Sequence, residues 1–265
     1  MDYENKERID ISVIMPALDE EKNIIPAIDN TLASFKDFNM QGEVIVINDG
    51  SRDRTEDLVQ ELMKKDNRVR MIKHKIPEGV GASFWDGVDN ARGGIIVALP
   101  GDNENEPREI FRYLKLLEDV DMVVPFVYNK RARTLFRNIL TFALMAILNA
   151  TFRAHFKYTS GTVLFRKSIL DDLDYRCRSF FLGTDILVRL AKRGYLYAEV
   201  PYRIGTRNTG KSKAVTLSNS LHVIREYLRL VKDMYFAKKE RLKRYKFSGD
   251  SVSIKRYSRS RGLVE

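Results

Sequence analysis

The chain has 265 residues, of which 44% are hydrophobic and 31% charged, an ordinary composition for a globular protein that excludes wholesale disorder. Its single cysteine, Cys177, excludes an internal disulfide framework and a cysteine-rich zinc site. The apolar stretch 139–148 is about half of the roughly 20 residues that a spanning helix needs, and the charged N-terminal segment is unlike a secretory signal. We therefore expect a cytoplasmic chain with only peripheral membrane contact.

The net charge of +10 conceals a split between the two halves of the chain. Residues 1–121 carry 16 Lys and Arg against 26 Asp and Glu, whereas residues 122–265 carry 30 against 10. Residues 122–170 contain eight bases and no acid. This asymmetry indicates that the second half meets a polyanion, a phosphate-bearing ligand or an anionic membrane surface. The alternative is a solvated basic face.

Apolar runs rich in β-branched residues predict the strands of the first half, and helical patterns separate them. Continuous apolar strands alternating with helices are typical of an α/β protein with a parallel sheet covered on both faces. In such sheets ligands bind outside the carboxyl ends of the strands. The predicted strands are 11–15, 44–47, 69–72, 95–99 and 122–124, and the predicted helices are 20–35, 54–64 and 82–91.

The second half has a different pattern. A long apolar helix is predicted over 132–152, with arginines near its ends, and residues from 248 onward resemble a flexible basic tail. The remaining predictions are a strand at 162–165, a helix at 184–193, a strand at 196–200, a loop at 201–214 and a helix over 215–244.

Polar motifs follow the first three predicted strands. The first two strands end in MPALDEE (15–21) and INDGSRDRT (47–55), whose residues are also good turn and cap formers. The third connection, IPEGVGASFWDG (76–87), has Gly79 and Gly81 before a helix, as phosphate-binding loops do. Phe84 stands where the dinucleotide fingerprint has its last glycine, which disfavours a dinucleotide oxidoreductase.

The fourth strand ends in PGDNENEP, which contains Asp102, Glu104 and Glu106. Side chains two residues apart on extended backbone point the same way, so the three carboxylates are expected to face one point. Hard oxygen ligands suit Mg²⁺ or Mn²⁺, completed by substrate phosphates. The alternative is a solvated acidic loop in which Asp102 caps the next helix.

The order of these motifs resembles the family 2 glycosyltransferases of the GT-A fold. Downstream, TSG (159–161), AEVPYRIGTR (198–207) and NTGKSKA (208–214) resemble the branch that loads sugars onto polyprenyl phosphates, the dolichol-phosphate mannose synthases and their relatives. The resemblance spans roughly residues 10–214. It implies a GT-A domain over 1–214, with a nucleotide-sugar half (1–125) and an acceptor half (126–214), followed by an amphipathic helix (215–247) and the tail (248–265).

The resemblance also implies roles for individual residues. Asp102 would hold the metal and the donor diphosphate, and Glu104 would also reach the metal. Asp185 stands where many members carry a catalytic acid residue, although it is equally an ordinary first-turn helix residue. Two positions depart from the family pattern, because Pro100 replaces the first aspartate of the DxD motif and Leu18 replaces an aromatic. The nucleotide-sugar site would comprise Pro16, Leu18, Glu20, Ile47, Asp49, Asp102, Arg207 and Lys213.

The implied reaction is metal-dependent, inverting transfer of a sugar from a GDP- or UDP-linked donor to a polyprenyl phosphate at a membrane surface. In that case helix 132–152 and the basic tail would contact anionic lipid, the alternative for the helix being the core. One rival function is transfer to a hydroxyl acceptor, with Asp185 taking the proton. Another is a non-catalytic homologue that binds a nucleotide-sugar. No specific nucleic acid is expected.

Overall fold

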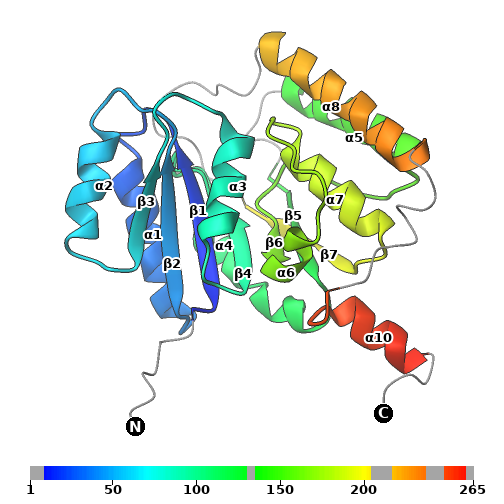
Figure 1. Ribbon diagram of the computed structural model, residues 1–265, viewed down its shortest axis with the longest axis horizontal. Helices are drawn as coiled ribbons and strands as arrows, with labels where there is room; N and C mark the ends of the chain where they lie inside the picture. The colour runs from blue at the N-terminus through cyan, green and yellow to red at the C-terminus, as the bar shows by residue number, and fades with distance from the viewer. Residues whose placement is uncertain (1–8, 130–134, 204–216, 237–247, 261–265) are drawn as a thin grey trace.

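The computed structural model describes residues 9–129, 135–203, 217–236 and 248–260. Its centre is a seven-stranded sheet with the order β3-β2-β1-β4-β6-β5-β7 (Figure 1). The strands are β1 (Ile11–Ala17), β2 (Gly42–Asn48), β3 (Val69–Lys73), β4 (Ile95–Ala98), β5 (Met122–Val127), β6 (Leu164–Arg166) and β7 (Tyr197–Tyr202).

The pairing of the strands confirms an α/β fold with a mostly parallel sheet. β1 lies between β2 and β4 and runs parallel to both, and β3 is parallel to β2. β7 is parallel to β5, whereas β6 runs antiparallel to β4 and β5. The direction of β6 was not predicted, because a short apolar run indicates a strand without indicating its direction.

Helices cover both faces of the sheet because the strands are apolar on both sides. In β2, Ile45 and Ile47 belong to a core with α3, α5 and α7, whereas Val44 and Val46 belong to a core with α1, α2 and α4. The helices are α1 (Ile24–Asp37), α2 (Thr55–Met63), α3 (Val80–Asn90), α4 (Pro107–Phe111), the 3₁₀ helix η1 (Leu114–Glu118), α5 (Leu135–Phe152), α6 (Lys167–Asp171), α7 (Leu182–Lys192), α8 (Leu217–Tyr235) and α10 (Val252–Ser260).

The long apolar helix of the second half is α5, and it is both a core helix and a surface helix. Met145, Leu148 and Phe152 are buried, and Phe152 stacks on Tyr235 of α8. Every α5 side chain that is exposed and described is apolar: Ile139, Phe142, Ala143, Ala146, Ile147 and Ala150. None of the described helices is long and apolar enough to cross a membrane.

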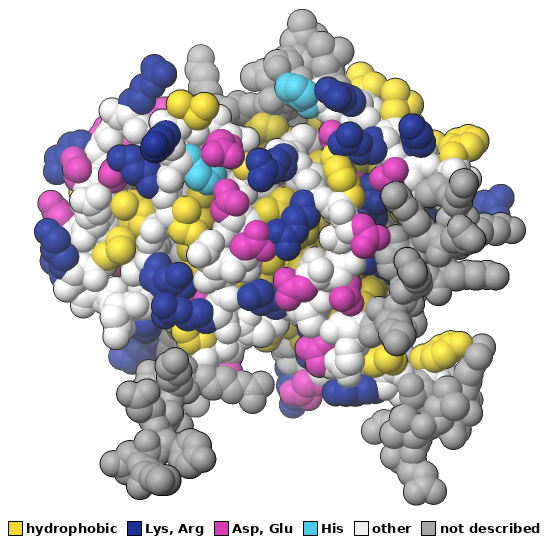
Figure 2. Space-filling view, viewed as in Figure 1, with side chains coloured by type: hydrophobic (Ala, Val, Ile, Leu, Met, Phe, Trp, Pro, Cys, Tyr) yellow, Lys and Arg dark blue, Asp and Glu magenta, His cyan; other side chains and the backbone are white. Residues whose placement is uncertain are grey.

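Helix α8 packs beside α5 and also has exposed apolar side chains. The hydroxyls of Thr151 and Tyr227 are 2.7 Å apart across the two helices. Ile224 and Leu228 of α8 are 55% and 59% exposed, and Figure 2 shows hydrophobic side chains at the surface over this helix. The two helices thus form one apolar surface, which we call the α5/α8 face: Ile139, Phe142, Ile147, Ile224 and Leu228.

The expectation of a flexible tail from residue 248 is wrong for residues 248–260. These residues contain α10, and the carboxylate of Asp121 caps its N-terminus, accepting hydrogen bonds from the backbone N–H of Val252 (2.8 Å) and Ser253 (3.1 Å). Asp121 is fully buried, and the Ser253 hydroxyl in turn accepts from the Leu196 N–H at 2.8 Å. A segment of basic composition is therefore docked on the end of the sheet.

Candidate functional site

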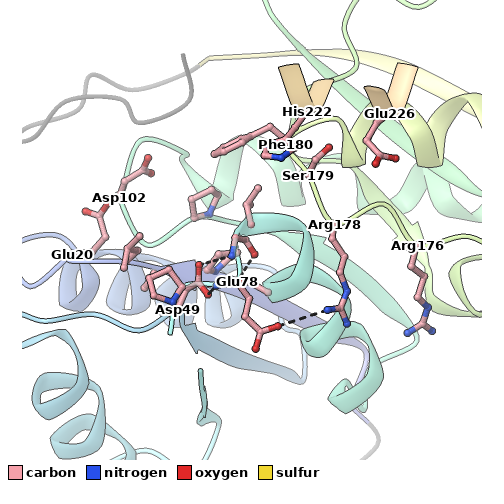
Figure 3. A pocket seen from close by; sticks show the side chains of 18 of the residues that line it. Glu20, Asp49, Glu78, Asp102, Arg176, Arg178, Ser179, Phe180, His222 and Glu226 are labelled. Carbon is pink, nitrogen blue, oxygen red and sulfur yellow. Dashed lines mark hydrogen bonds and ion pairs between the residues drawn. The ribbon is translucent and has the colours of Figure 1, made fainter. Parts of the chain in front are cut away.

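A cavity of about 1030 Å³ lies outside the carboxyl ends of β1, β2 and β4, where ligands bind in open α/β sheets. The loops after β1 to β4 form one side of it, and α8 with the segment before α7 forms the other (Figure 3). Its lining includes Pro16, Leu18, Glu20, Asp49, Glu78, Gly79, Asp102, Glu104, Tyr175, Arg176, Arg178, Phe180, His222, Arg225, Glu226 and Arg229. The cavity thus brings together most of the predicted site residues.

The DGSRDRT segment after β2 holds the loop after β1 in place. Its side chains accept hydrogen bonds from backbone N–H groups of that loop: Ser51 from Asp19 at 3.0 Å, and Asp53 from Glu21 at 3.0 Å. Asp19 has a positive φ of 56°, a conformation that these bonds support. These contacts fix the backbone that carries Leu18 and Glu20 into the cavity, a role beyond the turn and cap roles that the residue types alone suggested.

Asp49 lines the cavity and organises the loop after β3. Its Oδ1 accepts from the Glu78 N–H at 2.7 Å and its Oδ2 from the Gly79 N–H at 2.9 Å. His74 Nδ1 lies 2.7 Å from the same Oδ1, and its Nε2 lies 2.9 Å from Asp86. Burial lowers the pKa of His74, but its bonds to Asp49 and Asp86 outweigh burial and raise the pKa above the ordinary value.

Gly79, the residue before α3, and Gly81, in its first turn, do not make the phosphate-binding loop that their pattern suggested. The carboxylate of Asp49 already accepts from the N–H groups of Glu78 and Gly79, so these donors do not point at a ligand. A side chain at Gly81 would lie 2.2 Å from the backbone of Arg178. The close approach that glycine permits is therefore made to the opposite wall of the cavity.

Carboxylates gather on the side of the cavity formed by the loops after β1 and β4, which we call the acidic wall: Glu20, Asp102 and Glu104. In Figure 3 the Glu20 and Asp102 side chains lie close to each other on this side of the cavity. Asp102 Oδ1 accepts from the Glu104 N–H at 3.1 Å, which shapes the loop. Oxygen donors of this kind fit Mg²⁺ or Mn²⁺, which take one or two protein carboxylates together with substrate phosphates.

The expected convergence of three carboxylates after β4 is not found. Glu106 is exposed and does not line the cavity. Within the described parts of the chain, no three Asp, Glu, His or Cys side chains are arranged to hold a metal ion. The extended alternation that predicted convergence fails because this loop turns, and Asn103 has a positive φ of 55°. Asp102 and Glu104 alone remain on the cavity.

Ile47 and Asp185 do not lie on the cavity. Ile47 is fully buried in the core with α3. Asp185 is also fully buried and pairs with Arg189 one turn later, at 2.9 Å. Burial raises its pKa to about 6 against the lowering effect of Arg189. The predicted pair Arg207 and Lys213 lies outside the described residues.

The sequence interpretation missed the residues opposite the acidic wall. Five basic side chains line this part of the cavity, and we call it the cationic wall: Arg176, Arg178, His222, Arg225 and Arg229. In Figure 3 Arg176 and Arg178 extend from the segment before α7 alongside α3, Arg178 towards Glu78, and His222 lies on α8. A signal was present, since residues 222, 225 and 229 have the i, i+3, i+7 spacing of one helix face.

Comparison with known protein families identifies the family of this chain. The family model described as Glycosyl transferase family 2 matches residues 12–174 of this chain. The chain belongs to glycosyl transferase family 2. The predicted family is thereby confirmed. The match covers the acidic wall and β1 to β6, and it ends before α7 and α8.

Two curated relatives also match this chain. The undecaprenyl-phosphate 4-deoxy-4-formamido-L-arabinose transferase of Photorhabdus laumondii is 28% identical over 205 residues, which is 77% of this chain and 62% of the relative. The dodecaprenyl-phosphate galacturonate synthase of Rhizobium johnstonii is 25% identical over 134 residues, 49% of this chain and 40% of the relative. Both names contain a polyprenyl phosphate, which confirms the resemblance to that branch. The chain spans less than two thirds of the length of either relative.

Solved structures share the fold of this family 2 chain. Glucosyl-3-phosphoglycerate synthase from Mycobacterium tuberculosis, in complex with Mn²⁺, UDP and glucosyl-3-phosphoglycerate, has a TM-score of 0.64 at 22% identity, covering 84% of this chain and 80% of that one. The same enzyme in complex with Mg²⁺ and UDP has a TM-score of 0.61 at 19% identity, covering 85% of this chain and 79% of that one.

Proposed function

We propose that this chain transfers a sugar, with inversion, from a nucleotide-sugar to a polyprenyl phosphate at a membrane surface. The observation that carries the proposal is the cavity itself, which places a carboxylate wall opposite a cationic wall at the strand ends of a family 2 chain. Transfer between two phosphate-bearing substrates requires two anion sites facing one reaction centre. The cationic wall is a candidate for one, and a divalent cation on the acidic wall would supply the other.

The donor half of the proposal rests on the loops after β1, β2 and β4. Leu18 and Pro16 provide apolar surface for the base and ribose, and Glu20 provides a hydrogen-bond acceptor. Asp102 and Glu104 would hold a divalent cation, whose chemistry there is neutralisation of the departing diphosphate. The neighbouring structures contain UDP with Mn²⁺ or Mg²⁺, which supports a UDP-linked donor, with a GDP-linked donor as the other candidate.

The acceptor half rests on the chemistry of attack. An oxygen of the acceptor phosphate forms a bond to the anomeric carbon while the bond from that carbon to the nucleoside diphosphate breaks on the opposite face, so the configuration inverts. A phosphomonoester is largely ionised at neutral pH, because its second pKa is about 6. It therefore needs no general base, in keeping with the burial of Asp185 away from the cavity. A hydroxyl acceptor would need such a base.

The membrane part of the proposal rests on the α5/α8 face. Phe142 is 76% exposed and Ile139 is 58% exposed, although water-exposed apolar side chains of this size are usually scattered rather than grouped. Apolar side chains on two adjacent helices next to a cavity that takes a lipid phosphate would place the reaction at the bilayer surface. The curated relatives named for polyprenyl phosphates support the same acceptor class.

The decisive experiment is a thermal-shift panel of UDP- and GDP-linked sugars with and without Mn²⁺, followed by a transfer assay to undecaprenyl phosphate with the best donor. We expect one donor to raise the melting temperature only with Mn²⁺, since ligand binding stabilises the folded state. Product should form with undecaprenyl phosphate and not with undecaprenol. Binding without transfer would indicate the non-catalytic homologue, and transfer to undecaprenol or a free sugar would indicate a hydroxyl acceptor.

A further inference from the structure

The five basic side chains of the cationic wall differ in how far acidic partners already neutralise them. Arg176 pairs with Asp89 at 2.7 Å. Arg178 lies 3.7 Å from Glu78, and Arg229 lies 3.5 Å from Glu226. Arg225 has no acidic partner among the residues that the structure describes. The uncompensated positive charge of this wall is therefore on Arg225.

The position of Arg225 on α8 aims it at the cavity. His222, Arg225, Glu226 and Arg229 have the spacing of a single helix face, and all four line the cavity. His222 is one turn from Arg225 and supplies a ring N–H donor beside the guanidinium. Arg178 lines the cavity from the facing segment, and its guanidinium is directed at Glu78 in a long ion pair (Figure 3).

The face of α8 that meets the cavity is rigidly attached to the fold. The Tyr175 hydroxyl donates to Glu226 at 2.6 Å, and Arg229 donates to the same hydroxyl at 2.5 Å. One turn further, Asp233 accepts from the buried Arg189 of α7 at 2.7 Å. Arg225 is consequently presented on a helix whose orientation is fixed by polar contacts with α7 and with the segment before it.

An apolar stripe runs along α8 directly beside this cationic face. Leu228 is three positions after the cavity residue Arg225 and four after Ile224, spacings that make side chains neighbours on a helix, and both apolar side chains are largely exposed. One helix therefore carries a cationic face and an exposed apolar stripe that meet at Arg225 and Leu228. This juxtaposition matches an amphiphile with a single phosphate at one end.

We propose that Arg225, with His222 and Arg178, binds the phosphomonoester of the acceptor, and that Ile224 and Leu228 contact the first isoprene units of its chain. The proposal deepens the function proposed above and rests on it for the identity of the acceptor. The uncompensated charge of Arg225 attracts the acceptor phosphate to the cationic wall, whereas the diphosphate of the donor would be held by the divalent cation on Asp102 and Glu104. Each substrate would thereby have its own cationic partner within one cavity.

The test is equilibrium binding of farnesyl phosphate, below its critical micelle concentration, to the full chain. Arg225→Gln should weaken binding about tenfold or more, the range expected for loss of a charge-assisted hydrogen bond. Lys232→Gln is the matched control, because Lys232 is exposed on the same helix and does not line the cavity. It should bind farnesyl phosphate as the wild type does. Unchanged binding of farnesyl phosphate to Arg225→Gln would overturn the proposal.

A second ligand and a double variant separate the contribution of the head group from that of the chain. Glycerol 3-phosphate should bind more weakly than farnesyl phosphate but show the same dependence on Arg225, and Ile224→Ser with Leu228→Ser should weaken only farnesyl phosphate. Equal affinity for the two ligands would overturn the lipid part and assign the site to a soluble phosphomonoester. Binding of UDP with Mn²⁺ is measured on every variant, because its absence from the wild type would refute the donor site independently of Arg225.

Discussion

Nδ1 of His74 lies 2.7 Å from Oδ1 of Asp49, and both side chains are buried at the edge of the cavity. The same ring reaches Asp86 through Nε2 at 2.9 Å. A protonated ring donates to both carboxylates at once, whereas a neutral ring donates to only one of them. The loop after β3, which Asp49 also holds, is therefore coupled to the protonation of His74.

The pH dependence of stability follows from the raised pKa of His74. The stabilisation is complete below the ordinary histidine pKa of about 6.5 and is lost as the pH rises through the higher folded-state value. Unfolding by urea between pH 5.5 and 8.5 should reveal this loss in the wild type. His74→Asn should lower stability by roughly 1–3 kcal/mol at pH 5.5 and reduce the slope, leaving the part that comes from Asp185, whose pKa is raised to about 6. His155→Asn, at an exposed histidine, should keep the full slope.

Replacing the cavity carboxylate after β4 should affect catalysis more than folding. Asp102→Asn is expected to reduce transfer about 100-fold or more, because stabilisation of a leaving group by one electrostatic partner is worth about 3 kcal/mol. The Mn²⁺-dependent thermal shift with donor should disappear as well. Glu106→Gln removes the same charge from the same loop outside the cavity and should leave both measurements unchanged. Equal losses in the two variants would argue against a site at Asp102.

Asp185→Asn should act on stability rather than on proton transfer. Breaking a buried ion pair costs about 3–5 kcal/mol, and here the loss is reduced because Arg189 keeps its contact with Asp233. We expect a lower unfolding midpoint in urea and a pH–rate profile of unchanged shape for the remaining folded enzyme. A folded variant that loses transfer together with one limb of the profile would restore Asp185 as a catalytic base.

Removal of the cap on α10 should release that helix. Asp121→Ala is expected to cost about 1–2 kcal/mol, as for other helix N-caps, and to speed hydrogen exchange at Val252 and Ser253. Asp119→Ala removes a carboxylate that is 73% exposed and pairs with Arg256 of α10, and an exposed pair contributes little. Protection of the α10 amides should therefore survive in Asp119→Ala. Equal exchange in both variants would contradict the capping role.

Binding to lipid vesicles should depend on the α5/α8 face. Phe142→Ser is expected to weaken binding to vesicles that contain anionic lipid by about tenfold, since burying a phenylalanine side chain contributes about 1.5–3 kcal/mol. Tyr257→Ser, at a 45% exposed aromatic on α10, is the control and should bind as the wild type does. Turnover with a short, micelle-free acceptor should be the same in both variants. Unchanged vesicle binding by Phe142→Ser would remove this face from the membrane contact.

The sheet and the first wall of the cavity were predictable because both depend on local patterns. Apolar runs located β1 to β5, and the position of a residue after a parallel strand placed Glu20, Asp49 and Asp102 at one edge. Ile47 was misplaced because its strand is apolar on both faces. In such a strand the sequence does not indicate which side chain meets the cavity and which meets α3.

The remaining errors have a different physical origin, namely contacts between residues far apart in the chain. The basic composition of 248–260 hides α10, because its cap is the side chain of Asp121. Gly81 suggested a ligand, but its neighbour is the backbone of Arg178. The cationic wall combines the segment before α7 with α8. Neither segment contains a sequence motif that predicts its contact with the other.

Because α10 is docked on the fold, it can be used to observe how the protein is oriented on a lipid bilayer. In Figure 1 this helix lies at the opposite end of the molecule from α5 and α8, so a protein resting on a bilayer through those two helices would hold α10 away from it. The native thiol, Cys177, is buried and burial raises its pKa, which leaves it slow to react. A fluorophore on a cysteine introduced at Tyr257 would therefore report the height of the far end above the lipid, and quenchers confined to the bilayer would not reach it.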